Sequence, residues 1–136
     1  MEGNKMQASP LEKWQVERTA RFSYDFARDG GAVGDITLDD DVLPDDALIT
    51  RGMIHVKTAL VGATATVALT VNTSEDILAA TAITSFTLAA ILDVVPVRTA
   101  ATAIKTTTKK NLTMTIATAA LTAGKFEVFL SYYMGW

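Results

Sequence analysis

The side chains that could carry out acid–base chemistry are few. The chain has 136 residues, one histidine and no cysteine. A Ser–His–Asp triad would have to be built around that histidine, His55, yet no G-x-S-x-G motif marks a serine nucleophile. His55 stands in an alternating segment with Arg51, Met53 and Lys57. We therefore interpret it as a strand surface or interface residue rather than an acid, a base or a ligand, and we expect no enzymatic activity.

A run of carboxylates is the next candidate for chemistry. Asp39–Asp41 is followed by Asp45 and Asp46. Closely spaced carboxylates can hold Ca²⁺, which takes about six to eight oxygen ligands. The spacing differs from the D-x-[DN]-x-[DN]-G calcium loop, and Pro44 stiffens its middle. We interpret Asp39–Asp46 as a turn-rich loop that faces solvent or the basic residues of a partner, and we expect no metal and no other cofactor.

Two further groups of residues could contact phosphate. Gly30–Gly34 is glycine-rich, but it lacks the lysine of a phosphate-binding loop and a following helix. Lys105, Lys109 and Lys110 are close in sequence, but three lysines in a chain of net charge −3 make a poor footprint for nucleic acid. We interpret both groups as turns and expect no nucleic-acid partner.

The charged residues are distributed unevenly. Between Thr58 and Leu92 the only charges are Glu75 and Asp76. The charge-free run Ile77–Leu92 is shorter than the ~20 apolar residues that span a bilayer, and it includes hydroxyl side chains, so we expect no membrane association. Large uncharged surfaces often mark contact sites between proteins. This distribution predicts such a surface in the second half of the chain.

Alternation of apolar and polar residues predicts the elements that position these side chains. In Trp14–Phe26 one parity is mostly apolar and the other polar, which is typical of a half-buried strand. The same pattern predicts strands at Ala32–Leu38, Ala47–Thr58, Thr64–Val71, Thr102–Thr108, Asn111–Thr118 and Lys125–Met134. Ser85–Val97 fits a strand or a loop, and Asn72–Asp76 fits a loop or the cap of a short helix at Glu75–Ala82.

The spacing of these elements indicates the fold class. Turn signals recur about every ten residues, as in antiparallel sandwiches, and the βαβ alternation of a parallel sheet is missing. We expect an all-β fold, an antiparallel and jelly-roll-like β-sandwich with at most one short helix. Residues 1–13 show no periodicity, and we expect them to form an extended N-terminal arm. We expect residues 14–136 to form a single β-sandwich domain.

The aromatic residues are the candidates for assembly contacts. Trp14 begins the first predicted strand and Trp136 ends the sequence, soon after Tyr133. Exposed tryptophans are costly in water, so we expect them to pack against the protein itself or against a neighbouring chain, and the sequence favours neither. The residues that we predict as assembly contacts are Trp14, Phe22, Tyr24, Phe26, Tyr133 and Trp136.

A series of short motifs runs through residues 31–134. They are Leu43-Pro44…Ala47…Ile49, Val56…Thr58, Val71-Asn72…Asp76-Ile77…Ala79-Ala80, Ile104-Lys105 and Leu112-Thr113…Thr115-Ile116-Ala117…Ala120-Leu121-Thr122-Ala123-Gly124-Lys125. In these motifs the chain resembles small virion structural proteins of tailed bacteriophages, and in particular head decoration (cement) proteins.

The resemblance implies a function and a set of partners. A decoration protein binds the outer face of the major capsid protein lattice as a homotrimer and stabilises the head, and it has no catalytic residues. The implied location is the capsid surface of the virion. An alternative remains open, namely a phage tail-fibre, tail-tip or head-spike domain that binds a host surface.

Overall fold

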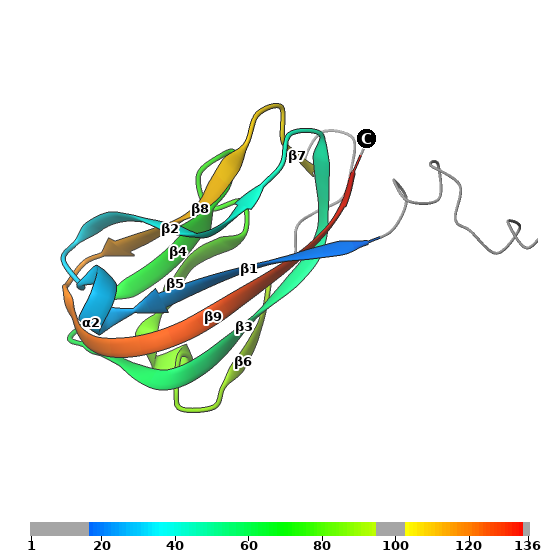
Figure 1. Ribbon diagram of the computed structural model, residues 1–136. Helices are drawn as coiled ribbons and strands as arrows, with labels where there is room; N and C mark the ends of the chain where they lie inside the picture. Colours follow the sequence, from blue (N-terminus) through cyan, green and yellow to red (C-terminus); the bar gives the residue numbers. More distant parts are fainter. Residues whose placement is uncertain (1–16, 95–102, 135–136) are drawn as a thin grey trace, which may run out of the picture.

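The computed structural model describes residues 17–94 and 103–134, which form a sandwich of two antiparallel sheets (Figure 1). Sheet A has the strand order β1-β9-β3-β6, with β7 also paired to β3, and sheet B has the order β2-β8-β4-β5. The strands are β1 (Arg18–Asp25), β2 (Gly34–Leu43), β3 (Ala47–Gly62), β4 (Thr66–Thr70), β5 (Leu78–Ala82), β6 (Ile91–Val94), β7 (Ile104–Lys105), β8 (Lys110–Ala117) and β9 (Leu121–Met134). A short helix, α2 (Phe26–Asp29), follows β1, and a 3₁₀ turn, η2 (Ile83–Ser85), follows β5.

The strand order defines a jelly roll. When the two-residue strand β7 is set aside, eight strands remain, four in each sheet. The order β1-β9-β3-β6 opposite β2-β8-β4-β5 arises because the chain passes repeatedly from one sheet to the other, as it does in two interleaved Greek keys. The predicted all-β, jelly-roll-like sandwich is therefore confirmed.

The core lies between the two sheets and follows the alternation of the sequence. In β1 the inward side chains Ala20, Phe22 and Tyr24 are buried, and the same holds for every second residue of β8 from Leu112 and of β9 from Phe126 to Leu130. Burying each large apolar side chain stabilises the fold by about 1.5–3 kcal/mol. Because successive side chains of a strand point to opposite faces, one face of each sheet is committed to the core.

A β-bulge interrupts the alternation in β3. Ile49 pairs with β9, and pairing resumes at Arg51 one residue further along β9, so Thr50 is an extra residue. One extra residue reverses which parity faces the core. Ile49 is therefore buried before the bulge, and Ile54 and Val56 are buried after it. The uninterrupted alternation predicted for this segment is wrong at this point.

The first predicted strand ends one residue earlier than expected. Asp25 accepts a hydrogen bond from the backbone N–H of Ala27 at 3.0 Å and so caps α2, which removes Phe26 from the strand. Residues 14–16, at the start of the predicted strand, and the predicted arm at residues 1–13 lie outside the described part of the chain.

The helix considered for Glu75–Ala82 is not formed; Leu78–Ala82 is strand β5. The side chain of Asp76 accepts hydrogen bonds from the backbone N–H groups of Val71, Asn72 and Thr73, at 2.7–2.9 Å. These bonds close a tight loop instead of starting a helix. Glu75 has a positive φ of 59°, which a helix does not allow.

The loop predicted at Asp39–Asp46 is also shorter than expected. β2 continues through Asp39–Asp41 to Leu43, and the turn is confined to the residues that follow. A run of three aspartates is unfavourable in a strand by propensity. Contacts between these side chains and β1, described below, override that propensity.

A buried threonine fastens the turn between β2 and β3. The hydroxyl of Thr106 donates to the carbonyl oxygen of Pro44 at 2.6 Å and accepts the backbone N–H of Ala47 at 2.9 Å. Thr106 is fully buried. Of the strand predicted at Thr102–Thr108, Ile104–Lys105 forms β7, and Thr106 follows it directly.

We predict that Thr106→Val destabilises the protein. Valine has nearly the same shape but lacks the hydroxyl, so the N–H of Ala47 and the carbonyl of Pro44 each lose a hydrogen bond. We expect the free energy of unfolding to fall by about 1–3 kcal/mol in urea titrations. The matched control is Thr37→Val at an exposed position of β2. Equal stability of Thr106→Val and the wild type would contradict the fastening role.

Candidate assembly surfaces

Two of the predicted contact residues lie in the core. Phe22 and Tyr24 are 0% exposed, which leaves no side-chain surface for another chain to contact. The Tyr24 hydroxyl donates to the carbonyl oxygen of Gly30 at 2.7 Å, and burial, helped by Asp29 and Asp25, raises the pKa of Tyr24 to about 12. The signal was in the sequence, because both residues share a parity with Ala20.

The other predicted contact residues have different surroundings. Phe26 is half-buried at the start of α2 and packs against the core. Tyr133, near the end of β9, is 38% exposed and remains a predicted assembly contact. Trp14 and Trp136 lie outside the described residues.

The candidates for catalysis and metal binding are separated in the fold. His55 is half-buried on the outer face of sheet A, in register with Glu127 of β9 and Ile91 of β6. Within the described ranges, no three His, Asp or Glu side chains are grouped so that they could hold a metal ion. None of the helices in those ranges has the length and hydropathy needed to span a membrane.

The glycines and lysines considered for phosphate binding have structural positions. Gly30 ends α2 with a positive φ of 76°, and its N–H donates to the carbonyl oxygen of Phe26 at 2.9 Å. Lys105 lies in β7, Lys109 directly precedes β8, and Lys110 is the first residue of β8. These positions agree with the interpretation of Gly30 as part of a turn.

The aspartates of β2 bond to the outer edge of β1. The carboxylate of Asp40 accepts the backbone N–H of Ser23 at 3.1 Å and its hydroxyl at 2.7 Å. The carboxylate of Asp41 accepts the backbone N–H of Arg21 at 3.2 Å. Arg28 of α2 forms an ion pair with Asp40 at 3.2 Å. Side chains of sheet B therefore satisfy N–H groups at the edge of sheet A, and the two sheets are joined there without a shared ladder.

The charge of Asp40 is stabilised by these contacts. Burial alone would raise the pKa of Asp40, but the hydrogen bonds from Ser23 and the nearby charge of Arg28 outweigh burial. Together they hold the pKa of this carboxyl below its ordinary value of 3.8. Asp40 and Asp41 of the acidic run, which is a candidate for an ion or a partner, thus accept hydrogen bonds from donors within their own chain.

A second ionic network lies on the outer face of sheet A. Glu127 of the central strand β9 is 6% exposed and forms ion pairs with Arg21 of β1 and with Lys57 of β3, the latter at 3.2 Å. Beside this network, Met53 and Phe129 are directly opposite each other and line a depression of about 350 Å³. Met53 is 41% exposed. This face therefore offers apolar surface between paired charges.

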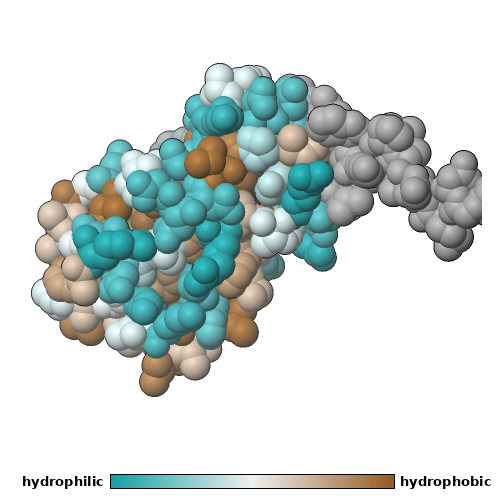
Figure 2. Space-filling model, in the orientation of Figure 1, coloured by the Kyte–Doolittle hydropathy of each residue, from teal (hydrophilic) through white to brown (hydrophobic). Residues whose placement is uncertain are grey.

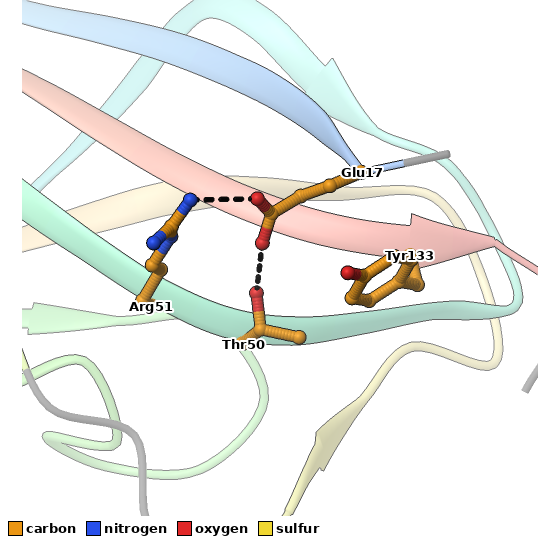
Figure 3. Close-up of a pocket in the computed structure, with 4 residues that line it drawn as sticks. All are labelled: Glu17, Thr50, Arg51 and Tyr133. Carbon is orange, nitrogen blue, oxygen red and sulfur yellow. Dashed lines mark hydrogen bonds and ion pairs between the residues drawn. The ribbon is translucent and has the colours of Figure 1, made fainter. Parts of the chain in front are cut away.

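A second pocket, of about 440 Å³, lies where β1 begins (Figure 3). Glu17 accepts a hydrogen bond from the hydroxyl of Thr50 at 2.9 Å and forms an ion pair with Arg51 at 2.8 Å. Figure 3 shows these three side chains bonded in a row and the ring of Tyr133 beside them. The carboxylate of Glu17 bonds to two residues of β3, and these contacts attach the start of β1 to the bulged part of that strand.

Comparison with known proteins gives a fold likeness. No protein-family model matches the sequence, and no curated protein matches it. Among solved structures, a chain of "Capsid of Ralstonia phage GP4" has a TM-score of 0.63 at 18% identity, over 89% of this chain and 86% of that one. A chain of "Cyanophage Pam1 capsid asymmetric unit" has a TM-score of 0.65 at 15% identity, over 89% and 86%. A chain of "Acidic stable capsid structure of Helicobacter pylori bacteriophage KHP30" has a TM-score of 0.60 at 15% identity, over 88% of each.

These similarities define the class of fold. The match extends over most of this chain and most of each phage chain, so the chains share the arrangement of the whole sandwich. At 15–18% identity the likeness is one of fold. The protein is a jelly-roll sandwich similar to chains of three phage capsid structures.

We predict that Asp40→Asn destabilises the protein at neutral pH and not in strong acid. The folded-state pKa of Asp40 is lower than its ordinary value of 3.8, so the ionised carboxylate stabilises the fold above that pH. This contribution disappears as the pH falls through the lowered folded-state pKa. We expect a loss of about 1 kcal/mol at neutral pH, measured by urea unfolding.

The control for this prediction is Asp39→Asn. Asp39 is exposed on the same strand and makes none of the hydrogen bonds described for Asp40. An equal loss for both variants, or a difference from the wild type that persists in strong acid, would show that the edge contacts are unimportant.

Proposed function

We propose that the chain is a bacteriophage capsid decoration protein that binds the outer face of the major capsid protein lattice as a homotrimer and stabilises the head. The observation that carries the proposal is the likeness, over most of both lengths, to chains in three phage capsid structures. The motifs in residues 31–134, which resemble head decoration proteins, point the same way.

A jelly roll by itself hosts many functions, so the surfaces must support the proposal. The polar groups of Asp40, Asp41, Glu127 and Glu17 bond to neighbouring strands of the same chain. Within the described ranges every buried side-chain nitrogen and oxygen has a partner. Polar groups that bond within the chain in this way suit a protein that acts by contact rather than by turnover. We propose that the protein is not an enzyme.

The proposed partner also fits the exposed surface. A head under internal pressure requires many modest contacts, and each copy offers apolar side chains such as Met53 and Tyr133 beside paired charges. Apolar residues surrounded by polar ones are common in protein interfaces. We propose the virion as the location, with the protein on the capsid surface.

Binding to shells tests the proposal. The chain is mixed with empty shells of the major capsid protein encoded in the same viral genome, and the shells are then sedimented. We expect the chain to sediment with the shells in a fixed ratio to the capsid protein and to saturate. The readout is the amount of bound chain by quantitative gel densitometry.

Head stability gives a second readout. Particles that lack the protein should release DNA at a lower temperature than complete particles, and adding the purified chain should restore the higher temperature. If shells bind none of it, or if virions carry it only in the few copies of a tail component, the proposed function is wrong and the host-binding alternative is favoured.

A further inference from the structure

One lateral edge of the sandwich carries almost no charge, the exception being the exposed Asp93 of β6. The run Ile77–Leu92 includes β5, η2 and the start of β6, and none of its residues is ionisable. β5 is the last strand of sheet B and β6 is the last strand of the β1-β9-β3-β6 order in sheet A. The run therefore forms the rim where both sheets end, and we call it the charge-free edge.

The charge-free edge is also the most exposed apolar part of the described residues. Leu88 is 70% exposed and Ile91 is 68% exposed, the two highest values among the large hydrophobic side chains there. Seven other residues of the run are exposed, and all are Ala, Ser or Thr. The edge therefore has two exposed large aliphatic side chains among exposed residues that are otherwise small.

The backbone that carries Leu88 is held in place. Phe86 is fully buried, and its carbonyl oxygen accepts the N–H of Leu60 at 3.1 Å. Further along, Val56 exchanges hydrogen bonds with the backbone of Ala89 and Ala90, at 3.0 and 2.9 Å. Leu88 is thus presented by a segment fixed to β3, which lowers the entropy that a contact would cost.

The opposite edge of the sandwich has the reverse character. There β1, α2 and β2 bring together Arg28, Asp29, Asp40 and Asp41. Figure 2 shows mainly hydrophilic atoms over β1 and β2, and hydrophobic atoms at the lower margin, where the segment before β6 lies in Figure 1. Charge is therefore concentrated on one edge, whereas the run Ile77–Leu92 of the other edge carries none and Asp93 of β6 is the first charge after it.

We propose that copies of this chain contact one another through the charge-free edge, with the edges of three copies meeting around a three-fold axis. A charged partner surface would lose water there and gain no counter-charge, which is unfavourable. The charge-free edge of another copy is a surface that leaves no charge unpaired. This inference rests on the homotrimer in the proposed function and identifies the surface that forms it.

The size of the edge indicates how strong the contact is. Nine residues of the run are exposed, whereas a standard interface uses roughly 20–30 residues on each side. We therefore expect free copies to associate weakly, with a dissociation constant of about micromolar order, and to be held more firmly when a shell aligns them.

Crosslinking tests the proposed contact directly. The chain has no cysteine, so Leu88→Cys introduces a single thiol that a short bis-maleimide can link between copies. We expect covalent dimers to form about tenfold faster than for Val42→Cys, an exposed residue of β2 near the charged edge. Equal rates for the two variants would overturn the proposal.

Sedimentation of variants gives an independent test. The wild type should increase in mass with concentration from the 14.5 kDa of one chain. Leu88→Ser with Ile91→Ser should remain monomeric over the same range, whereas Val33→Ser with Val42→Ser should behave as the wild type. Circular dichroism checks that both variants fold. Association that survives in the first variant, or is lost in the second, would refute the edge contact.

The two proposals can fail separately. If Leu88→Cys crosslinks rapidly but the wild type does not bind shells, the edge contact stands and the decoration function is wrong. If the wild type binds shells but Leu88→Cys and Val42→Cys crosslink equally, the decoration function stands and another surface joins the copies.

Discussion

The contact between the inward faces of sheets A and B is the constraint on which the rest of the protein depends. The apolar residues that alternate along β1, β8 and the middle of β9 are committed to that contact, so charge is left mainly to the outer faces and to the rims. Even the irregular positions obey it, since the bulge at Thr50 keeps both Ile49 and Ile54 in the core. A partner can therefore contact only the outer faces of the two sheets and the rims of the sandwich.

The sequence predicted the fold class because period-two alternation is a local signal. In β1 the buried residues Ala20, Phe22 and Tyr24 are those of the parity that the sequence marked as apolar. The bulge was not predictable, because the choice of which residue is extra depends on the partner strand. The segment that became β5 was ambiguous for a related reason: the carboxylate of Asp76 can cap a helix or close a loop, and pairing with β4 decides between them.

The candidate site was harder to predict than the fold. Phe22 and Tyr24 were assigned to assembly because they are aromatic, although their parity placed them in the core. Asp40 and Asp41 were considered for a metal or a partner, but their donors belong to residues 17 and 20 positions earlier in the chain. Such long-range pairs carry no sequence pattern of their own. Uneven charge was the local signal that did identify an unusual surface, the run Ile77–Leu92.

The carboxylates along β1 also limit how the chain can polymerise. A sheet that is open at both ends can add strands on each side, and repetition of that step produces fibrils. Here Asp40 and Asp41 occupy backbone donors at one end of sheet A. Sheet A can therefore add strands from a neighbour only at its other edge, which removes one of the two templates that its continued growth would need.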